Sequence, residues 1–137
     1  MKYLLDTNVC ISYLNKAESL VRTRMQMLKP SEILLCSVVE AELYFGVMKS
    51  ATPSKNLSKL TPFLNQFVSL SFDNKAARKF GRIRTDLAKA GTPIGPYDLQ
   101  IAAIALVNKL ILVTHNTREF SRVVGLPLED WEQDPVK

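Results

Sequence analysis

The chain has 137 residues, 47% of them hydrophobic, which suits one domain with a buried core, so we expect a single domain over residues 1–137. No stretch reaches the roughly 18 consecutive apolar residues of a membrane span, and the start lacks the features of a signal peptide. The sequence therefore predicts a cytoplasmic protein with no membrane partner. The formal net charge of +5 favours an anionic partner, although many basic proteins bind no nucleic acid. The spacing of Cys10 and Cys36 argues against a zinc site or a disulfide framework.

Short apolar runs alternate with helical patterns along the chain. Runs of strand length occupy residues 3–5, 33–36, 68–70 and 110–113, and the tail predicts an edge strand that buries Trp131. Helical patterns occupy residues 9–14, 17–28, 38–48, 57–67, 73–90 and 96–106, and residues 51–59 are interpreted as a loop leading into the fourth helix. This alternation predicts a three-layer α/β fold with a central parallel sheet of four to five strands. The carboxyl ends of the strands then meet at one edge, where such folds bind ligands.

Asp6 ends the first apolar run, directly before a predicted helix. Its position at the carboxyl end of a strand makes it a candidate site residue. It is also a good helix cap, since Asp, Thr and Asn all accept hydrogen bonds from free backbone N–H groups. This stretch alone favours the cap.

Two glutamates lie in the helix that follows the second strand. Ser37 and Glu40 have the spacing of a capping box, which gives Glu40 a structural role. Glu42 has no such role, and Gly46 one turn later leaves space for something to approach the backbone. Glu42 is therefore the stronger candidate for a site.

The long helix at 73–90 is basic outside its apolar stripe. Arg78, Lys79 and Arg82 form either a solvated surface or a strip that faces phosphates. Pro96 suits the first position of the next helix, which places Asp98 in its first turn. The helix dipole stabilises a carboxylate there, but Asp98 is also a charge at the end of an otherwise apolar helix, which favours a functional role.

The fourth apolar run ends in Thr114, His115 and Asn116. Asn116 and Glu119 have the spacing of a second capping box, which is as good an interpretation as a site role. His115 is the single histidine and has no cysteine partner, so it is not included in the predicted site.

These acidic residues share a topological position although they are far apart in sequence. Asp6 ends a strand, and Glu42, Asp98 and Glu119 lie in first turns of helices, so the fold predicts that they converge. Crowded carboxylates repel unless a cation joins them, and hard oxygen ligands select Mg²⁺ or Mn²⁺. Such ions activate water and neutralise charge on a phosphodiester, so an acidic pocket beside a basic helix is the arrangement that a nuclease requires.

Four ordered motifs resemble those of PIN-domain ribonucleases, and among them the VapC toxins of bacterial toxin–antitoxin pairs. They are LLDTN at residues 4–8, VEAELYFG at 39–46, IGPYDLQIAA at 94–103 and VTHNTREF at 113–120. The resemblance covers nearly the whole chain. It implies an endoribonuclease that depends on Mg²⁺ or Mn²⁺, a homodimer, and neutralisation by a VapB-type antitoxin. The group that this chain resembles most cuts the anticodon stem-loop of initiator tRNA.

Carried over residue by residue, the resemblance implies that Asp6, Glu42 and Asp98 are the core acidic triad. Glu42 is the acid four residues before the glycine of the family's pattern, in agreement with the capping argument. The fourth acidic position falls on Glu119, where many relatives carry Asp, so the resemblance leaves open whether Glu119 binds metal directly, binds it through water or only caps its helix. Asn8, Thr114 and Asn116 are implied to support these ligands.

Two other functions are compatible with parts of the pattern. Phosphatases that form an aspartyl-phosphate also carry Asp after a first strand, but they usually have a second Asp two residues on, where this chain has Asn8. A non-catalytic module that binds RNA or a protein on the same fold is the other alternative. The complete triad argues against it.

Overall fold

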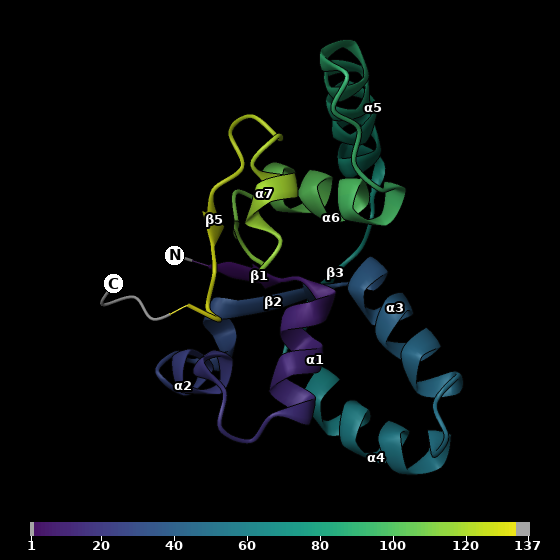
Figure 1. The fold of residues 1–137 in the computed structure, drawn as a ribbon, viewed down its shortest axis with the longest axis vertical. Coiled ribbons are helices and arrows are strands. Elements are labelled where there is room, and N and C mark those ends of the chain that lie inside the picture. Colours follow the sequence, from purple (N-terminus) through teal and green to yellow (C-terminus); the bar gives the residue numbers. More distant parts are fainter. Residues whose placement is uncertain (1, 134–137) are drawn as a thin grey trace.

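The computed structural model describes residues 2–133 (Figure 1). The strands are β1 (Tyr3–Leu5), β2 (Ile33–Cys36), β3 (Val68–Leu70), β4 (Ile111–Val113) and β5 (Leu128–Glu129). The helices are α1 (Thr7–Asn15), α2 (Leu20–Gln26), α3 (Ser37–Met48), α4 (Pro53–Leu64), α5 (Asn74–Ala90), α6 (Pro96–Val107) and α7 (Thr117–Phe120), with a 3-10 turn, η1, at Pro30–Glu32.

The five strands form one parallel sheet in the order β3-β2-β1-β4-β5. Helices α1 to α4 lie on one side of the sheet, and α6 and α7 lie on the other, with α5 projecting beyond α6 (Figure 1). The predicted three-layer α/β fold with a parallel sheet is therefore confirmed. None of the helices in residues 2–133 is both long and apolar enough to cross a lipid bilayer.

The strand order has a topological switch beside β1. The chain adds β2 and β3 on one side of β1, and then returns to add β4 and β5 on the other side. Leu5 pairs with Val113, so β1 and β4 end at the same level. Open α/β sheets bind ligands at such a switch, outside the carboxyl ends of the strands.

A continuous apolar core keeps these strand ends in place. All four residues of β2 and all three of β4 are buried, and α6 buries a nearly unbroken run from Leu99 to Ala105. Trp131 is fully buried, as predicted, and packs edge-on against Tyr3 with the ring centres 5.2 Å apart. The fixed core positions the polar residues that follow each strand.

The start of α4 differs from the prediction. The sequence predicts a loop over residues 51–59, but α4 already begins at Pro53, which occupies its first turn. Proline fits the start of a helix because its missing N–H would have no partner there. The prolines and serines of this segment therefore begin a helix, and only a short connection separates α3 from α4.

Candidate active site

Asp6 and Thr114 meet where β1 and β4 end. The backbone N–H of Asp6 donates to the carbonyl of Val113 over 3.0 Å, which continues the pairing of the two strands. Asp6 is only 5% exposed, and its Oδ2 accepts a 2.8 Å hydrogen bond from the fully buried Thr114 hydroxyl. Its Oδ1 accepts from the backbone N–H of Thr7 over 2.8 Å, so Asp6 is also the cap of α1. Asp6 therefore both caps α1 and lies at the topological switch between β1 and β4.

Glu42 reaches the same strand end from α3. Its Oε1 accepts a 2.7 Å hydrogen bond from the Thr7 hydroxyl, so Thr7 links the Asp6 and Glu42 carboxylates. A Cβ placed on Gly46 would meet no atom within 4 Å, so the space predicted near Glu42 is present. Sequence reasoning did not select Thr7, because a threonine after a capping aspartate has an adequate structural role without a distant partner.

Two of the four predicted carboxylates, Asp98 and Asp6, have raised pKa values. Burial, and after it the negative charges of Asp6, Glu119 and Glu42, raise the pKa of Asp98 to about 6. Burial also raises the pKa of Asp6, against the hydrogen bonds from Thr114 and Thr7, and the charge of Glu42 adds to the rise. The fold thus brings together Asp6, which follows β1, and acids from α3, α6 and α7.

Glu119 lies at this edge through a contact different from the predicted capping box. The Asn116 side-chain amide donates to Glu119 Oε2 over 2.8 Å, and the Asn116 backbone N–H donates to the Thr114 hydroxyl over 3.0 Å. The side chain of Asn116 makes no capping bond to α7, although Asn116 does occupy the cap position. The side chain of Asn116 holds the Glu119 carboxylate instead.

The capping box predicted at Ser37 and Glu40 is wrong. Cys36 holds the cap position of α3, and Ser37 is its first residue. The Glu40 carboxylate accepts a hydrogen bond from the hydroxyl of Ser69 in β3, which the sequence could not place nearby. Glu40 still has a structural role, and Glu42 is the glutamate that contacts the residues at the end of β1.

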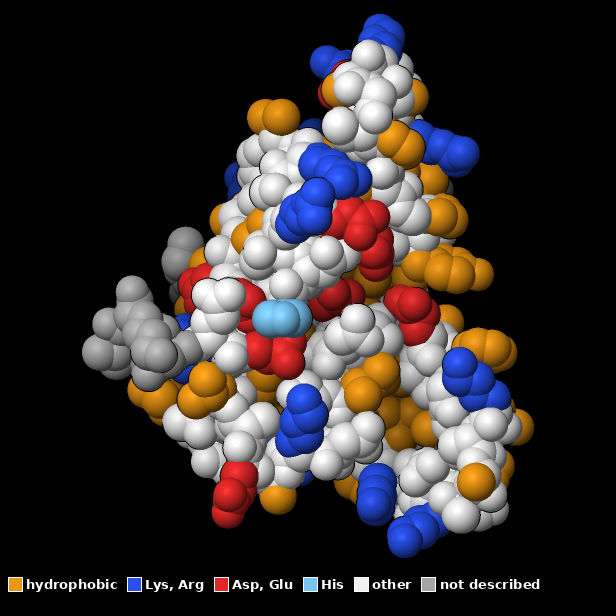
Figure 2. Space-filling model, viewed as in Figure 1, with side chains coloured by type: hydrophobic (Ala, Val, Ile, Leu, Met, Phe, Trp, Pro, Cys, Tyr) orange, Lys and Arg blue, Asp and Glu red, His pale blue; other side chains and the backbone are white. Residues whose placement is uncertain are grey.

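The acidic side chains gather in the middle of one face, around the pale-blue His115 (Figure 2). His115 Nδ1 lies 3.0 Å from Asp130 Oδ2 and 3.6 Å from Glu132 Oε2. Among the described residues, these three supply the one group of possible ligand atoms that all lie within 4.8 Å of one another. The four predicted carboxylates of the candidate site do not form a group this tight.

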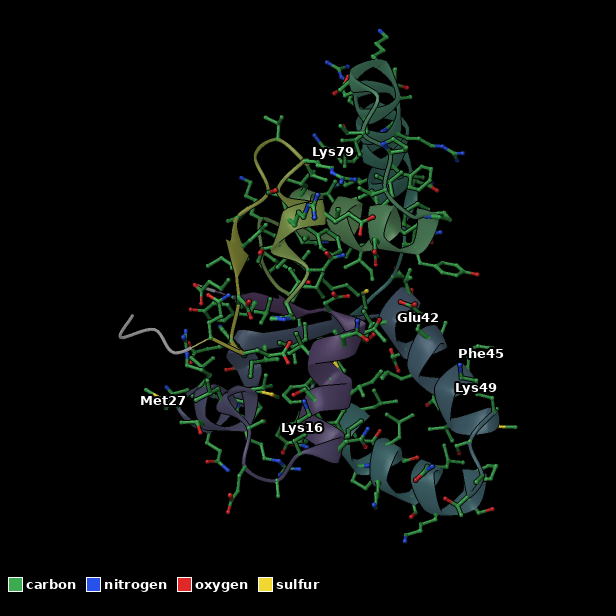
Figure 3. All side chains as sticks on the ribbon, in the orientation of Figure 1. Lys16, Met27, Glu42, Phe45, Lys49 and Lys79 are labelled. Atoms are coloured by element: carbon green, nitrogen blue, oxygen red, sulfur yellow. The ribbon has the colours of Figure 1, made fainter. Side chains whose placement is uncertain are left out.

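Basic side chains surround this acidic centre. Lysine and arginine side chains lie above and below the acidic ones on this face (Figure 2), and Figure 3 labels Lys16, Lys49 and Lys79 in the same orientation. Lys79 belongs to the predicted basic strip on α5, and Arg78 and Arg82 of that strip are exposed on the same helix. Asn8 is exposed and lines a cavity on each side of the start of α1. An anionic chain that crosses this face would find cations around the acids.

A family model described as "PIN domain" matches residues 3–126. The chain belongs to the PIN-domain family. Within this family it belongs with the VapC proteins. It is 40% identical to the "tRNA(fMet)-specific endonuclease VapC" of Salmonella typhimurium over 131 aligned residues. The aligned region covers 96% of this chain and 98% of that protein. A protein of the same name from Shigella flexneri is 42% identical over the same shares of both chains.

Solved structures of VapC proteins have the same fold. The structure of "DNA bound VapBC from Salmonella typhimurium" contains a chain that superposes with a TM-score of 0.90 at 39% identity, over 96% of this PIN chain and 98% of that one. A chain of "VapBC2 from Rickettsia felis bound to a DNA fragment from their promoter" also gives 0.90, at 38% identity, over 96% and 99% of the two chains. The PIN fold therefore extends over nearly the full length.

Proposed function

We propose that this protein is the toxin of a VapBC pair, an endoribonuclease that requires Mg²⁺ or Mn²⁺ and cuts structured RNA. Initiator tRNA is the first substrate to test, because two relatives at 40% and 42% identity are named tRNA(fMet)-specific endonucleases. The observation that carries the proposal is the raised pKa of Asp98, which is due first to burial and then to the negative charges of Asp6, Glu119 and Glu42. A site that collects this much negative charge next to a buried strand end is suited to a cation.

The donor set fits a hard divalent cation. Asp6, Glu42, Asp98 and Glu119 would hold it with carboxylate oxygens, which Mg²⁺ and Mn²⁺ prefer over nitrogen or sulfur. A bound ion of this kind lowers the pKa of water and neutralises the charge that builds up on a phosphodiester during cleavage.

The protein's own residues orient this donor set. The hydroxyls of Thr114 and Thr7 hold the carboxylates of Asp6 and Glu42 at 2.8 and 2.7 Å, so these groups are positioned before any ligand arrives. The side-chain amide of Asn116 does the same for Glu119 at 2.8 Å. The basic residues on this face would hold the RNA backbone, because lysine and arginine bind phosphates without reading sequence. Arg78, Lys79 and Arg82 remain the predicted strip for this contact.

A VapB-type antitoxin is the proposed protein partner. Support comes from the VapBC structures, one of which is described as "a member of the VapBC family of toxin-antitoxin systems" and shares 29% identity with this chain at a TM-score of 0.71. The homodimer implied by the resemblance stays a prediction that analytical ultracentrifugation of the purified chain would test.

Cleavage of purified initiator tRNA tests the proposal. We expect the protein, freed of antitoxin, to cut the tRNA with Mg²⁺ or Mn²⁺ and to leave it intact in EDTA. Asp6→Asn, Glu42→Gln and Asp98→Asn should each abolish cleavage while the circular dichroism spectrum stays native. Full activity in EDTA would contradict the metal requirement, and transfer of a phosphoryl group from a phosphomonoester to Asp6 would favour the phosphatase alternative.

A further inference from the structure

A cavity of about 730 Å³ opens directly beside the candidate active site. It lies between the start of α1, one face of α3 and the first turn of α6, and Thr7, Asn8 and Glu42 are among its lining residues. Ligand cavities of about 300–1,000 Å³ accommodate small organic groups. Because Glu42 lines this cavity, a group bound in it would lie next to one of the proposed metal ligands.

Two exposed aromatic side chains line the cavity. Phe45 is 65% exposed and Tyr97 is 60% exposed, although large apolar side chains are usually buried. Phe45 follows Glu42 by three residues, so both lie on the same face of α3 (Figure 3). Tyr97 immediately precedes Asp98 in the first turn of α6. Each aromatic residue therefore lies within one helical turn of an acid of the candidate site.

A cation and two side-chain amides also line the cavity. Lys49 follows Phe45 by one turn, and its Nζ lies 5.1 Å from the centre of the Phe45 ring (Figure 3). Asn8 and Gln100 add side-chain amides, which donate and accept hydrogen bonds. Along α3 the order is thus an acid, an aromatic ring and a positive charge, running away from the site.

We propose that this cavity binds a nucleobase of the RNA adjacent to the cleaved phosphodiester. The base stacks on Tyr97 and Phe45, and Lys49 contacts a phosphate further along the strand. Proteins recognise single-stranded RNA with this combination of aromatic faces, cations and base-edge hydrogen bonds. The amides of Asn8 and Gln100 are placed to read the edge of the base. This inference rests on the proposed function, and it assigns the cavity to the substrate because the proposed metal ligand Glu42 lines the cavity.

Single-turnover cleavage of initiator tRNA by wild type and variants tests the assignment. Tyr97→Leu should raise the protein concentration for half-maximal cleavage about ten-fold, within the range for loss of one base–aromatic stack. Tyr97→Phe should restore it, because the ring is retained. Tyr44→Leu is the matched control, since Tyr44 is 42% exposed on α3 and does not line the cavity. Lys49→Gln should raise the same concentration and reduce its salt dependence, whereas Lys55→Gln on α4 should leave both unchanged.

The Mg²⁺ concentration for half-maximal rate distinguishes stacking from a structural role. If Tyr97→Leu changes this concentration and leaves RNA affinity unchanged, Tyr97 acts through Asp98 and the inference is wrong. If Tyr97→Leu and Phe45→Leu cleave normally and lose only antitoxin inhibition, the cavity belongs to the protein partner, which also overturns the inference. If the wild type itself cuts no RNA, the proposed function fails and the inference with it.

Discussion

Asp98→Asn should stabilise the metal-free protein at neutral pH while it removes metal binding. Burial, and then the charges of Asp6, Glu119 and Glu42, raise the pKa of Asp98 from 3.8 to about 6 in the folded state. The folded state therefore binds more protons than the unfolded state between these pH values, and the free energy of unfolding falls as pH rises through the window. A pKa rise of this size corresponds to at most about 3 kcal/mol at pH 7.5. Because Asp98 is partly exposed to solvent, we reduce this to about 1 kcal/mol.

Thermal denaturation in EDTA measures this effect. At pH 7.5 Asp98→Asn should melt about 3 °C above wild type, and near pH 4 the two proteins should melt together. Added Mg²⁺ should then raise the melting temperature of wild type and leave that of the variant nearly unchanged. Glu18→Gln is the control, since Glu18 is an exposed carboxylate between α1 and α2. A variant that melts below wild type at pH 7.5 would refute the argument that Asp98 is destabilised by its acidic neighbours.

Three further outcomes follow from single contacts. Glu42→Gln should abolish RNA cleavage in the assay above, whereas Glu40→Gln should keep most of it, and the reverse would mean that the wrong glutamate was chosen. Thr114→Val should raise the Mg²⁺ concentration required for cleavage and lower the free energy of unfolding in urea by about 1–3 kcal/mol, because it removes a hydrogen-bond donor to the buried Asp6 carboxylate. An unchanged Mg²⁺ requirement would show that this hydrogen bond is dispensable. Burial raises the pKa of Cys36 to about 11 and that of Cys10 well above its usual value. Neither thiol should therefore react with iodoacetamide at pH 8 until the protein is denatured. Rapid alkylation of the native protein would contradict this prediction.

The sequence predicted the sheet because its strands are short, apolar and closed by polar residues. This pattern also predicted where the candidate site lies, since parallel strands with right-handed crossovers end at one edge. The strand-end argument placed Asp6 and Asn116 at that edge, and the resemblance added Thr114. The structure joins Thr114 to Asp6 by a hydrogen bond, although the two are 108 residues apart. The alternation of strands and helices in the sequence was therefore enough to predict both the parallel sheet and the edge where the candidate site lies.

Tertiary contacts explain what sequence patterns missed. A capping box is a local pattern, but Glu40 instead contacts Ser69, whose strand lies beside β2. His115 appeared isolated because its partners Asp130 and Glu132 approach only after β5 joins the sheet. The sequence also did not predict the exposure of Tyr97, because a tyrosine in a largely apolar helix is expected to be buried.

Binding of Mn²⁺, followed by the loss of the free-ion electron paramagnetic resonance signal, tests the central claim most directly. The claim is that Asp6, Glu42 and Asp98 act together with Glu119 as the ligands of one divalent cation centre. We predict that wild type and Glu40→Gln bind Mn²⁺ equally, that removal of any triad carboxylate abolishes tight binding, and that Mg²⁺ competes for the same centre. Equal binding of Mn²⁺ by wild type and by Asp6→Asn, Glu42→Gln and Asp98→Asn would contradict the account.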